Sequence, residues 1–216
     1  GLVTSGLPNL FGIGGGNIYF PLGDIDACLT AQQKSLHYAQ GAKSASSEVR
    51  ALGGLADAYY QRVQMITAFE YYDRCVTLAR EQGFKRIETA NLAMRGLTKF
   101  YSIEFQDLFD DCRQAIDICD HFGDARGAAI ARVNLSMLGL YRADWKTALE
   151  EAELGISLAM QIGARRFESD CMCYKAEALA ALGDRNQAEQ VVDAVYQINL
   201  EMGLSYCGPI ILGLMA

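Results

Sequence analysis

Residues 127–166 read GAAIARVNLSMLGLYRADWKTALEEAELGISLAMQIGARR, and this stretch decides the fold. Its apolar residues recur at helical spacing and predict two helices, at residues 128–141 and 145–162. The corner Arg142-Ala143-Asp144 joins the two helices, and Gly163 closes the second one as a C-terminal cap. The stretch therefore predicts an antiparallel helical hairpin.

The same pattern returns at intervals of 40 residues on both sides of this hairpin. Glycine closes the unit at Gly83, Gly123, Gly163 and Gly203. A small residue recurs early in the second helix at Cys28, Ala68, Ala148 and Ala188, with Leu108 as the exception. Another recurs near its end at Ala39, Ala79, Cys119 and Ala159, with Asn199 as the exception. The residue before that helix is always polar, and we expect its aspartates to be N-caps: Asp24, Gln64, Glu104, Asp144 and Asp184.

A period of about 40 residues with two helices per unit is typical of a solenoid of helical hairpins. We therefore predict an all-α fold, a right-handed superhelical solenoid of antiparallel helix hairpins, in a single domain over residues 1–216. Complete repeats are predicted at residues 47–86, 87–126, 127–166 and 167–206, a degenerate one at 7–46, and the start of another at 207–216. Because the sequence begins with Gly and stops inside an apolar segment, we expect a piece of a longer protein.

Composition excludes several classes of function. The net charge of −7 argues against non-specific binding to nucleic acid or to an anionic membrane. No apolar run approaches the roughly 20 residues of a spanning helix. The 7 cysteines lie mostly in apolar helix columns, which favours a reducing compartment over a disulfide framework. We expect a cytoplasmic protein that binds neither nucleic acid nor membrane.

The sequence holds no recognisable catalytic, cofactor or metal site. The two histidines, His37 and His121, both fall in second helices, which makes a histidine-activated nucleophile improbable. Cys171 and Cys173 have no further Cys or His at ligand spacing. The glycine-rich residues 12–16 resemble a phosphate-binding loop but lack the flanking strand, the helix and the Lys-Ser/Thr pair. We predict a protein that is not an enzyme and holds no cofactor or metal; a nucleotide site at residues 12–16 is the weakest alternative.

One repeat carries the spacing of a known family. Leu52, Leu55, Ala56 and Tyr59 place two large groups, a small one and an aromatic one on one helix face, and Ala68 follows. This spacing resembles the tetratricopeptide repeat (TPR), whose usual unit has 34 residues. The resemblance implies longer helices here, chiefly the second of each hairpin.

In the TPR family, positions just past the small residue point into a concave groove. The resemblance carries this role to Phe20, Tyr60, Phe100, Leu140 and Ala180, and to the neighbouring column Pro21, Gln61, Tyr101, Tyr141 and Ala181. We interpret Phe20, Tyr60, Gln61, Phe100, Tyr101, Leu140 and Tyr141 as a partner-binding groove suited to a peptide or helix with apolar anchors. The alternative is that these side chains fill the core between repeats. Tyr101 and Tyr141 are the better candidates, since a hydroxyl favours exposure.

Charged residues suggest two further surfaces. Arg86, Arg126 and Arg166 form a column that could bind anions, or could join adjacent repeats through Glu88 and Glu168, which we favour.

Five aspartates lie opposite an apolar helix face in one second helix: Asp107, Asp110, Asp111, Asp117 and Asp120. They predict either a docking stripe for a basic partner or, as we favour, a solvated outer face.

Several strings extend the resemblance over nearly the whole chain. They include residues 16–23, 50–59, 83–88, 163–168 and 207–209. They resemble the C-terminal TPR region of bacterial class III adenylate/guanylate cyclases that carry an AAA-type ATPase module. This resemblance implies a regulatory arm of a bacterial signalling protein, which binds a protein or peptide, including another domain of the same protein. A small-effector sensor is the alternative, and the partner and any homo-oligomer stay open.

Overall fold

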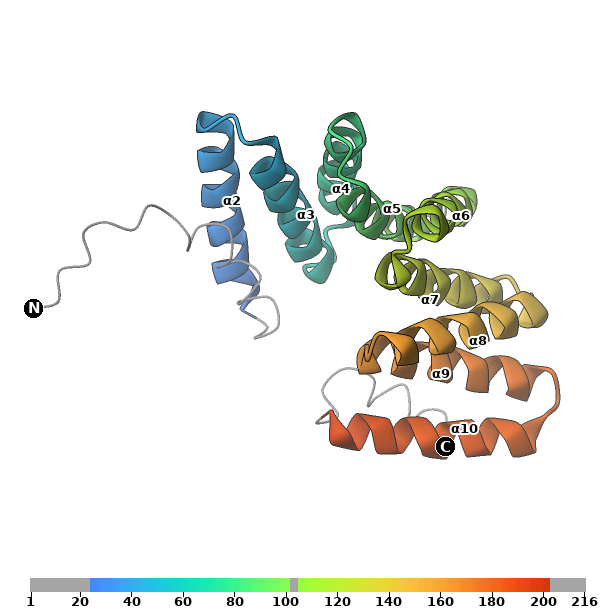
Figure 1. The fold of residues 1–216 in the computed structure, drawn as a ribbon. Helices are drawn as coiled ribbons and strands as arrows, with labels where there is room; N and C mark the ends of the chain where they lie inside the picture. The colour runs from blue at the N-terminus through green and yellow to red at the C-terminus, as the bar shows by residue number, and fades with distance from the viewer. Residues whose placement is uncertain (1–23, 102–104, 203–216) are drawn as a thin grey trace, which may run out of the picture. The chain divides into compact units, whose positions relative to one another are not determined.

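The computed structural model describes residues 24–101 and 105–202, and these residues form nine α-helices and no strand (Figure 1). The chain divides into two compact units, unit 1 over residues 1–104 and unit 2 over residues 105–216. Unit 1 contains α2 (Ile25–Gly41), α3 (Ala45–Gln61), α4 (Met65–Glu81) and α5 (Lys85–Phe100). Unit 2 contains α6 (Phe105–Phe122), α7 (Ala125–Tyr141), α8 (Trp145–Gln161), α9 (Arg165–Ala181) and α10 (Arg185–Glu201).

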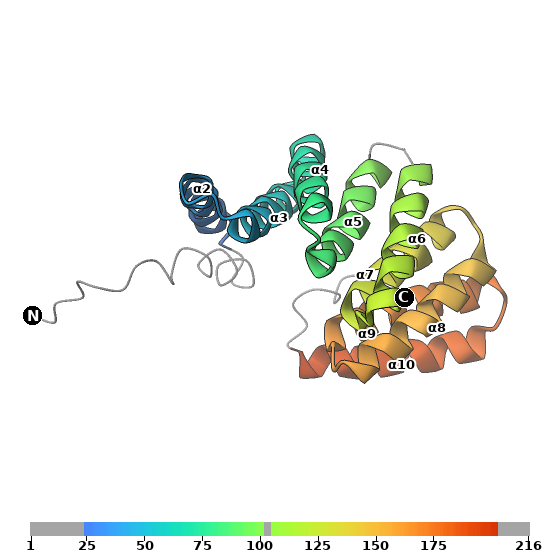
Figure 2. The same ribbon diagram turned by 45° about the horizontal axis from the view of Figure 1, so that its top comes forward.

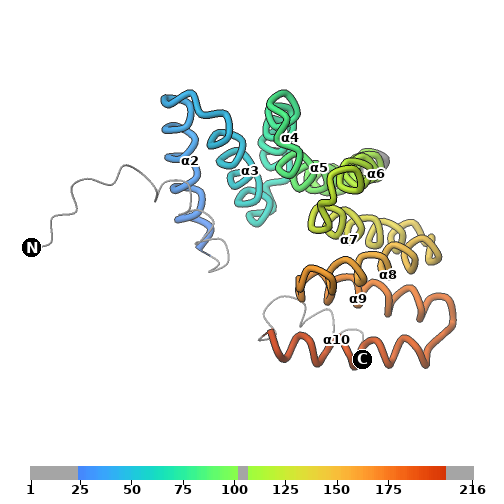
Figure 3. Tube along the Cα trace, in the orientation of Figure 1, coloured from blue at the N-terminus to red at the C-terminus, as the bar shows by residue number. Residues whose placement is uncertain are grey.

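Within each unit, every helix packs against the next one in the chain (Figure 2). In addition, α3 contacts α5, and α7 contacts α9. The tube drawing in Figure 3 shows the antiparallel course of α7, α8, α9 and α10 and the tight corners between them. Helices joined by short corners and packed on sequence neighbours are the architecture predicted for stacked hairpins. The all-α hairpin fold is confirmed.

The hairpin over residues 127–166 matches its predicted bounds with two differences. Helix α7 begins at Ala125, three residues before the predicted start, because Asp124 accepts a hydrogen bond from the Gly127 backbone N–H and caps the helix. The expectation that the second helix is the longer one is wrong, since α7 and α8 both have 17 residues. The additional residues of this repeat are shared equally between its helices.

The predicted small columns form the centre of the helix contacts. Cys28, Ala68, Leu108, Ala148 and Ala188 are all buried, as are Ala39, Ala79, Cys119, Ala159 and Asn199. Leu108 and Asn199, which depart from the small-residue pattern, are therefore buried like the other residues of their columns. Asn199 is accommodated because its side-chain N–H₂ donates to the Ser169 hydroxyl at 2.6 Å and to the Val195 carbonyl at 2.9 Å.

The capping prediction holds for each aspartate before a second helix. The side chains of Asp24, Asp144 and Asp184 accept from the backbone N–H three residues later, whereas Gln64 makes no such bond. Glu104, also in this column, lies outside the described residues. The three-residue corners have a common conformation, with a residue of positive φ in the middle position. Gly83, Gly163 and Gly183 provide it, and so do Lys43, Val63 and Ala143. Gly123 also has positive φ, in the two-residue corner before α7; Gly203 lies outside the described residues.

Six cysteines lie in the described residues, and all six are free and buried. Burial raises the pKa of the Cys75 thiol to about 12, so this thiol stays protonated at neutral pH. No group of three metal-ligating side chains occurs among the described residues. None of the helices in this part of the chain has the length and apolar character needed to cross a membrane.

Candidate functional site

The helices fall into two sets with different surroundings. We call α3, α5, α7 and α9 the A helices, and α2, α4, α6, α8 and α10 the B helices. Helix α3 packs between α2 and α4, α7 between α6 and α8, and α9 between α8 and α10. The A helices also contact one another within each unit. We call the remaining side of the A helices in each unit its A face, and the groove prediction refers to this side.

In unit 1 the predicted residues gather at the carboxyl ends of α3 and α5. The Tyr60 and Tyr101 rings lie 6.2 Å apart between centroids, tilted by 55°. Tyr101 is 52% exposed and Gln61 is exposed. Phe100, in contrast, is buried and packs edge-on against Tyr101, so its assignment to an open groove does not fit its position. Phe20 and Pro21 lie outside the described residues.

In unit 2 the predicted residues are Leu140, half-buried, and Tyr141, 69% exposed. Sequence reasoning missed Ile130, Val133 and Met137, which are half-buried one to three turns earlier on α7. Their spacing of three and four residues, with Leu140, was the signal that could have found them. The A face of unit 2 therefore carries a continuous apolar strip, which ends at Tyr141.

Two carboxylates at the same repeat position, 120 residues apart, were also missed. Asp57 accepts a hydrogen bond from the buried Tyr72 hydroxyl at 2.6 Å. Burial raises the pKa of Asp57 and outweighs the lowering by this bond. Burial also raises the pKa of Glu177, which is half-buried on α9. The residue corresponding to Tyr72 in the last hairpin is Val192, so the equivalent hydroxyl is missing there.

The arginine column does not bind the glutamates that were assigned to it. Glu88 accepts from Arg80 Nε at 2.7 Å and Lys85 Nζ at 2.9 Å, and Glu168 accepts from Arg165. Lys85 and Arg165, directly before Arg86 and Arg166, pair with these glutamates within the first turns of α5 and α9, and Arg80 joins the end of α4 to Glu88 on α5.

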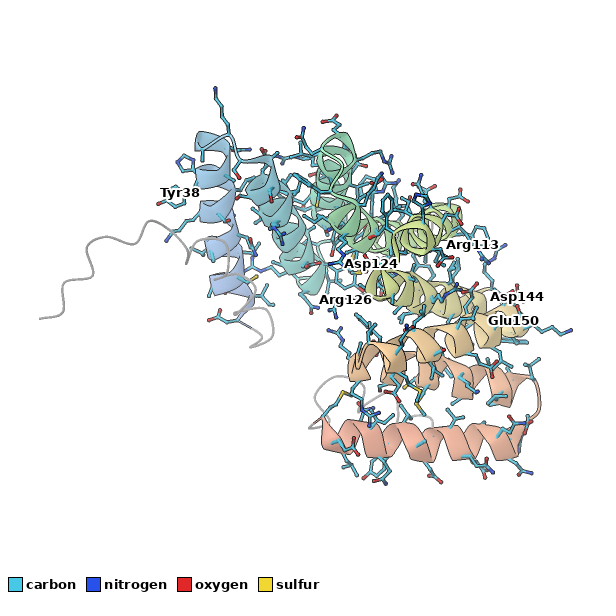
Figure 4. The ribbon with its side chains drawn as sticks, viewed as in Figure 1. Tyr38, Arg113, Asp124, Arg126, Asp144 and Glu150 are labelled. Atoms are coloured by element: carbon cyan, nitrogen blue, oxygen red, sulfur yellow. The ribbon has the colours of Figure 1, made fainter. Side chains whose placement is uncertain are left out.

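The three arginines of the column are exposed. The guanidinium of Arg126, labelled on α7 in Figure 4, lies 5.2 Å from the centroid of the Phe167 ring. Arg166 Nε lies 4.0 Å from an Asp170 carboxylate oxygen. These contacts are within one unit, and the anion-binding role of Arg86, Arg126 and Arg166 stays a prediction.

The acidic helix α6 presents exposed aspartates at Asp107, Asp110, Asp117 and Asp120. Asp111 differs, since it is buried with the apolar residues of the same helix. Its inclusion in the solvated stripe was therefore wrong. Asp111 and Glu151 are 40 residues apart and occupy the same position in successive repeats, and both are buried.

Glu151 is the centre of a buried ion-pair cluster in unit 2. It accepts from Arg132 at 2.6 Å and lies 3.2 Å from a guanidinium nitrogen of Arg113. Arg132 Nε is buried without a hydrogen-bond partner in the described part of the chain. Since Glu151 joins α6, α7 and α8, we interpret the cluster as structural.

The formal charge of the chain is concentrated in unit 2. Residues 105–216 contain 17 Asp and Glu against 9 Lys and Arg, a net charge of −8. Residues 1–104 contain 9 Asp and Glu against 10 Lys and Arg, a net charge of +1. The composition of the whole chain conceals this asymmetry.

Comparison with models of known families finds no match, and comparison with curated proteins finds none either. Solved structures do match. BtubC (BKLC) from P. vanneervenii superposes with a TM-score of 0.71 at 17% identity, over 87% of this chain and 78% of that one. A putative kinesin light chain from Podosopora anserina with nearly identical TPR-like repeats gives a TM-score of 0.63 at 16% identity, over 88% and 93% of the two chains.

A third match is the Signal Transduction ATPase with Numerous Domains (STAND) protein PH0952 from Pyrococcus horikoshii, which has a tetratricopeptide repeat sensor. Its TM-score is 0.70 at 14% identity, over 92% of this chain and 30% of that one. At these identities the likeness establishes the fold alone. The chain therefore has an all-α, TPR-like repeat fold.

Proposed function

We propose that this chain is a non-catalytic protein-interaction scaffold, which binds a partner segment on the A faces of its hairpins. The observation that carries the proposal is the row of half-buried and exposed apolar groups on the A face, ending in Tyr101 in unit 1 and Tyr141 in unit 2. Large side chains presented by rigid helices lose little conformational freedom on binding, and aromatic groups often dominate the affinity of an interface.

The TPR-like fold supports the same proposal. Stacked hairpins present a long surface on helices that are held by their neighbours, and such surfaces are used to bind extended partners. The solved structures that match this chain are repeat proteins of this type. Each hairpin can then contribute one or two side chains to the recognition of a partner segment.

We further propose that the scaffold is a regulatory arm of a larger bacterial signalling protein in the cytoplasm. The STAND protein supports this, because there a tetratricopeptide repeat sensor is joined to a signal-transduction ATPase. The strings that resemble the cyclase-associated TPR region point the same way. A partner within the same full-length protein would make the arm autoregulatory.

A small-effector sensor is the second candidate function. It is favoured by the tetratricopeptide repeat sensor of the STAND protein and by the contact between the Tyr60 and Tyr101 rings, which could hold a planar ligand. Substitution of these tyrosines should abolish the binding of a peptide if the site is a peptide site, and the binding of a small molecule if it is an effector site.

A displayed library of random 12-residue peptides, selected on the immobilised full chain, tests the proposed function. We expect enrichment of peptides with apolar anchors, and loss of their capture by the double variant Tyr101→Ala, Tyr141→Ala. Tyr38→Ala is the matched control, because Tyr38 is 56% exposed but lies on the B helix α2. It should capture the peptides like the original chain.

Thermal unfolding separates a binding role from a packing role. The double variant should retain its helicity and melt within a few degrees of the original chain, since both side chains are mostly exposed. Unchanged capture by the double variant would place the binding surface elsewhere. A large loss of stability would instead assign the two tyrosines to the core.

A further inference from the structure

We propose that the partner segment of unit 2 is apolar and basic, and that it places a Lys or Arg side chain against Glu177. This inference rests on the proposed function and names the chemistry of the partner at one of its two faces. The recognition elements are the apolar strip on α7 and the Glu177 carboxylate on the neighbouring α9.

The apolar strip supplies the anchoring surface. Ile130, Val133, Met137 and Leu140 are half-buried at successive turns of α7, and Tyr141 is exposed at its end. Helix α9 packs directly against α7. Met137 and Glu177 occupy the same repeat position on these two helices, 40 residues apart. A segment bound along the strip therefore passes the turn of α9 that carries Glu177.

Glu177 differs from the buried glutamates of unit 2. Glu151 accepts from Arg132 and Glu168 from Arg165, but Glu177 has no ion pair among the residues that the structure describes. A half-buried carboxylate without a cation is unfavourable, because burial removes hydration that nothing replaces. The raised pKa of Glu177, caused by burial, expresses the same cost.

The equivalent site in unit 1 shows how such a carboxylate is satisfied internally. Asp57 receives the Tyr72 hydroxyl at 2.6 Å, whereas the position corresponding to Tyr72 is Val192 in the last hairpin. A valine cannot donate a hydrogen bond. The donor missing inside the hairpin can be supplied by a partner, and an ammonium or guanidinium group is the donor that a carboxylate binds most strongly.

The charge of the unit favours the same partner. A net charge of −8 on residues 105–216 attracts a basic segment and accelerates its association. The near-neutral unit 1 lacks this attraction. The exposed aspartates of α6 add to the field of unit 2 without needing to touch the segment.

The same peptide selection, repeated on Glu177→Gln and on Glu189→Gln, tests the inference. Glu189 is exposed on the B helix α10, so its substitution makes the same charge change away from the A face. Peptides enriched on the original chain should combine apolar residues with Lys or Arg at a fixed position. Their affinity should fall roughly tenfold on Glu177→Gln and stay within twofold on Glu189→Gln. Glu177→Lys should enrich acidic peptides instead.

The outcomes separate the inference from the proposed function. Enriched peptides without a fixed basic position, or basic peptides that bind Glu177→Gln undiminished, overturn the inference while peptide binding itself stands. If the original chain enriches no peptide, the proposed function and the inference fail together. The melting temperature of Glu177→Gln should equal or exceed that of the original chain, because removal of an unpaired buried charge does not destabilise the fold. A lower melting temperature with weaker binding would assign Glu177 a structural role.

Discussion

At the residue scale, Glu88 shows how one side chain joins two repeats. It is 1% exposed at the start of α5 and accepts from Arg80 at the end of α4 and from Lys85 in its own first turn. Although burial alone raises its pKa, the hydrogen bonds and charges of Lys85 and Arg80 lower the pKa of Glu88 below its ordinary value. The carboxylate is thus held ionised in the folded protein.

We predict that Glu88→Gln lowers the free energy of unfolding by about 1–2 kcal/mol at pH 7. The folded pKa lies below the unfolded value of about 4.3, so the contribution is complete above that pH and is lost as pH falls through the folded pKa. Urea unfolding between pH 7 and pH 3 should show the difference shrink. Glu81→Gln, an exposed change on α4, should stay within about 0.5 kcal/mol. A difference that grows at low pH would contradict this assignment.

Gly139 is the residue at which α7 and α8 come closest. A Cβ atom there would lie 2.8 Å from the backbone nitrogen of Ala148 and 2.9 Å from its Cα. Backbone atoms cannot move aside as a flexible side chain can, so the two helices would have to separate. The close approach of α7 and α8 therefore depends on the small size of Gly139 and Ala148.

Gly139→Ala should therefore lower the free energy of unfolding by about 1–3 kcal/mol. Gly41→Ala is the matched control, because a Cβ added at the end of α2 meets nothing within 4 Å. It should be neutral, or stabilising by up to about 1 kcal/mol, since alanine restricts the unfolded chain. Urea denaturation of the two variants measures both effects, and equal effects would refute the close approach.

The sequence predicted some of these residue roles correctly and others wrongly. The small columns and capping aspartates were correct because their roles repeat every 40 residues and depend on local geometry. The partners predicted for Glu88 and Glu168 were wrong: Lys85 and Arg165, one residue before the predicted arginines, pair with them, and Arg80 also pairs with Glu88. Glu177 was missed because its partial burial depends on the neighbouring helices and not on the local spacing.

At the element scale, the corners determine the regular period. Each described three-residue corner places a residue of positive φ in its middle, and the backbone N–H after it returns to a carbonyl five residues earlier, as from Gln64 to Tyr59 and from Phe84 to Ala79. Glycine adopts this conformation without strain, but Val63 adopts it at φ 60° with a branched side chain that is 76% exposed. The corner thus keeps its conformation even where a branched residue disfavours positive φ.

We predict that Val63→Gly raises the free energy of unfolding by about 0.5–1 kcal/mol, because the relief of left-handed strain exceeds the added freedom of the unfolded chain. Gly83→Ala should lower it by about 1 kcal/mol, since Gly83 has φ 72°. Thermal and urea unfolding of both variants give the sign of each effect. A loss of stability in Val63→Gly would show that the exposed valine contributes packing that outweighs its strain.

At the scale of the whole molecule, the repeats share a backbone design but differ in chemistry. Bridges between a B helix and the next A helix recur at the same repeat positions, from Asp73 to Arg95 and from Glu153 to Lys175. The net negative charge instead lies in unit 2, and the described contacts between two tyrosine rings lie in unit 1. A scaffold of this kind can present two different surfaces on one repeated fold.

The fold was predictable at this scale because a solenoid needs only contacts between neighbouring hairpins, which the period encodes. The A-face prediction was less complete, since burial depends on which neighbours cover each turn. Phe100 and Tyr101 are adjacent in sequence, yet one is buried and the other 52% exposed. Peptide binding and small-effector binding at the A face both stay predictions.

The most direct test of partner binding on the A face is methyl NMR of the full chain titrated with an enriched basic, apolar peptide. We predict shift changes concentrated at Ile130, Val133, Met137 and Leu140, on the A face of unit 2. Leu154 and Met160, exposed on the B helix α8, should keep their shifts. Peptide binding that shifts the methyls of Leu154 and Met160 and leaves those of α7 unchanged would contradict the account.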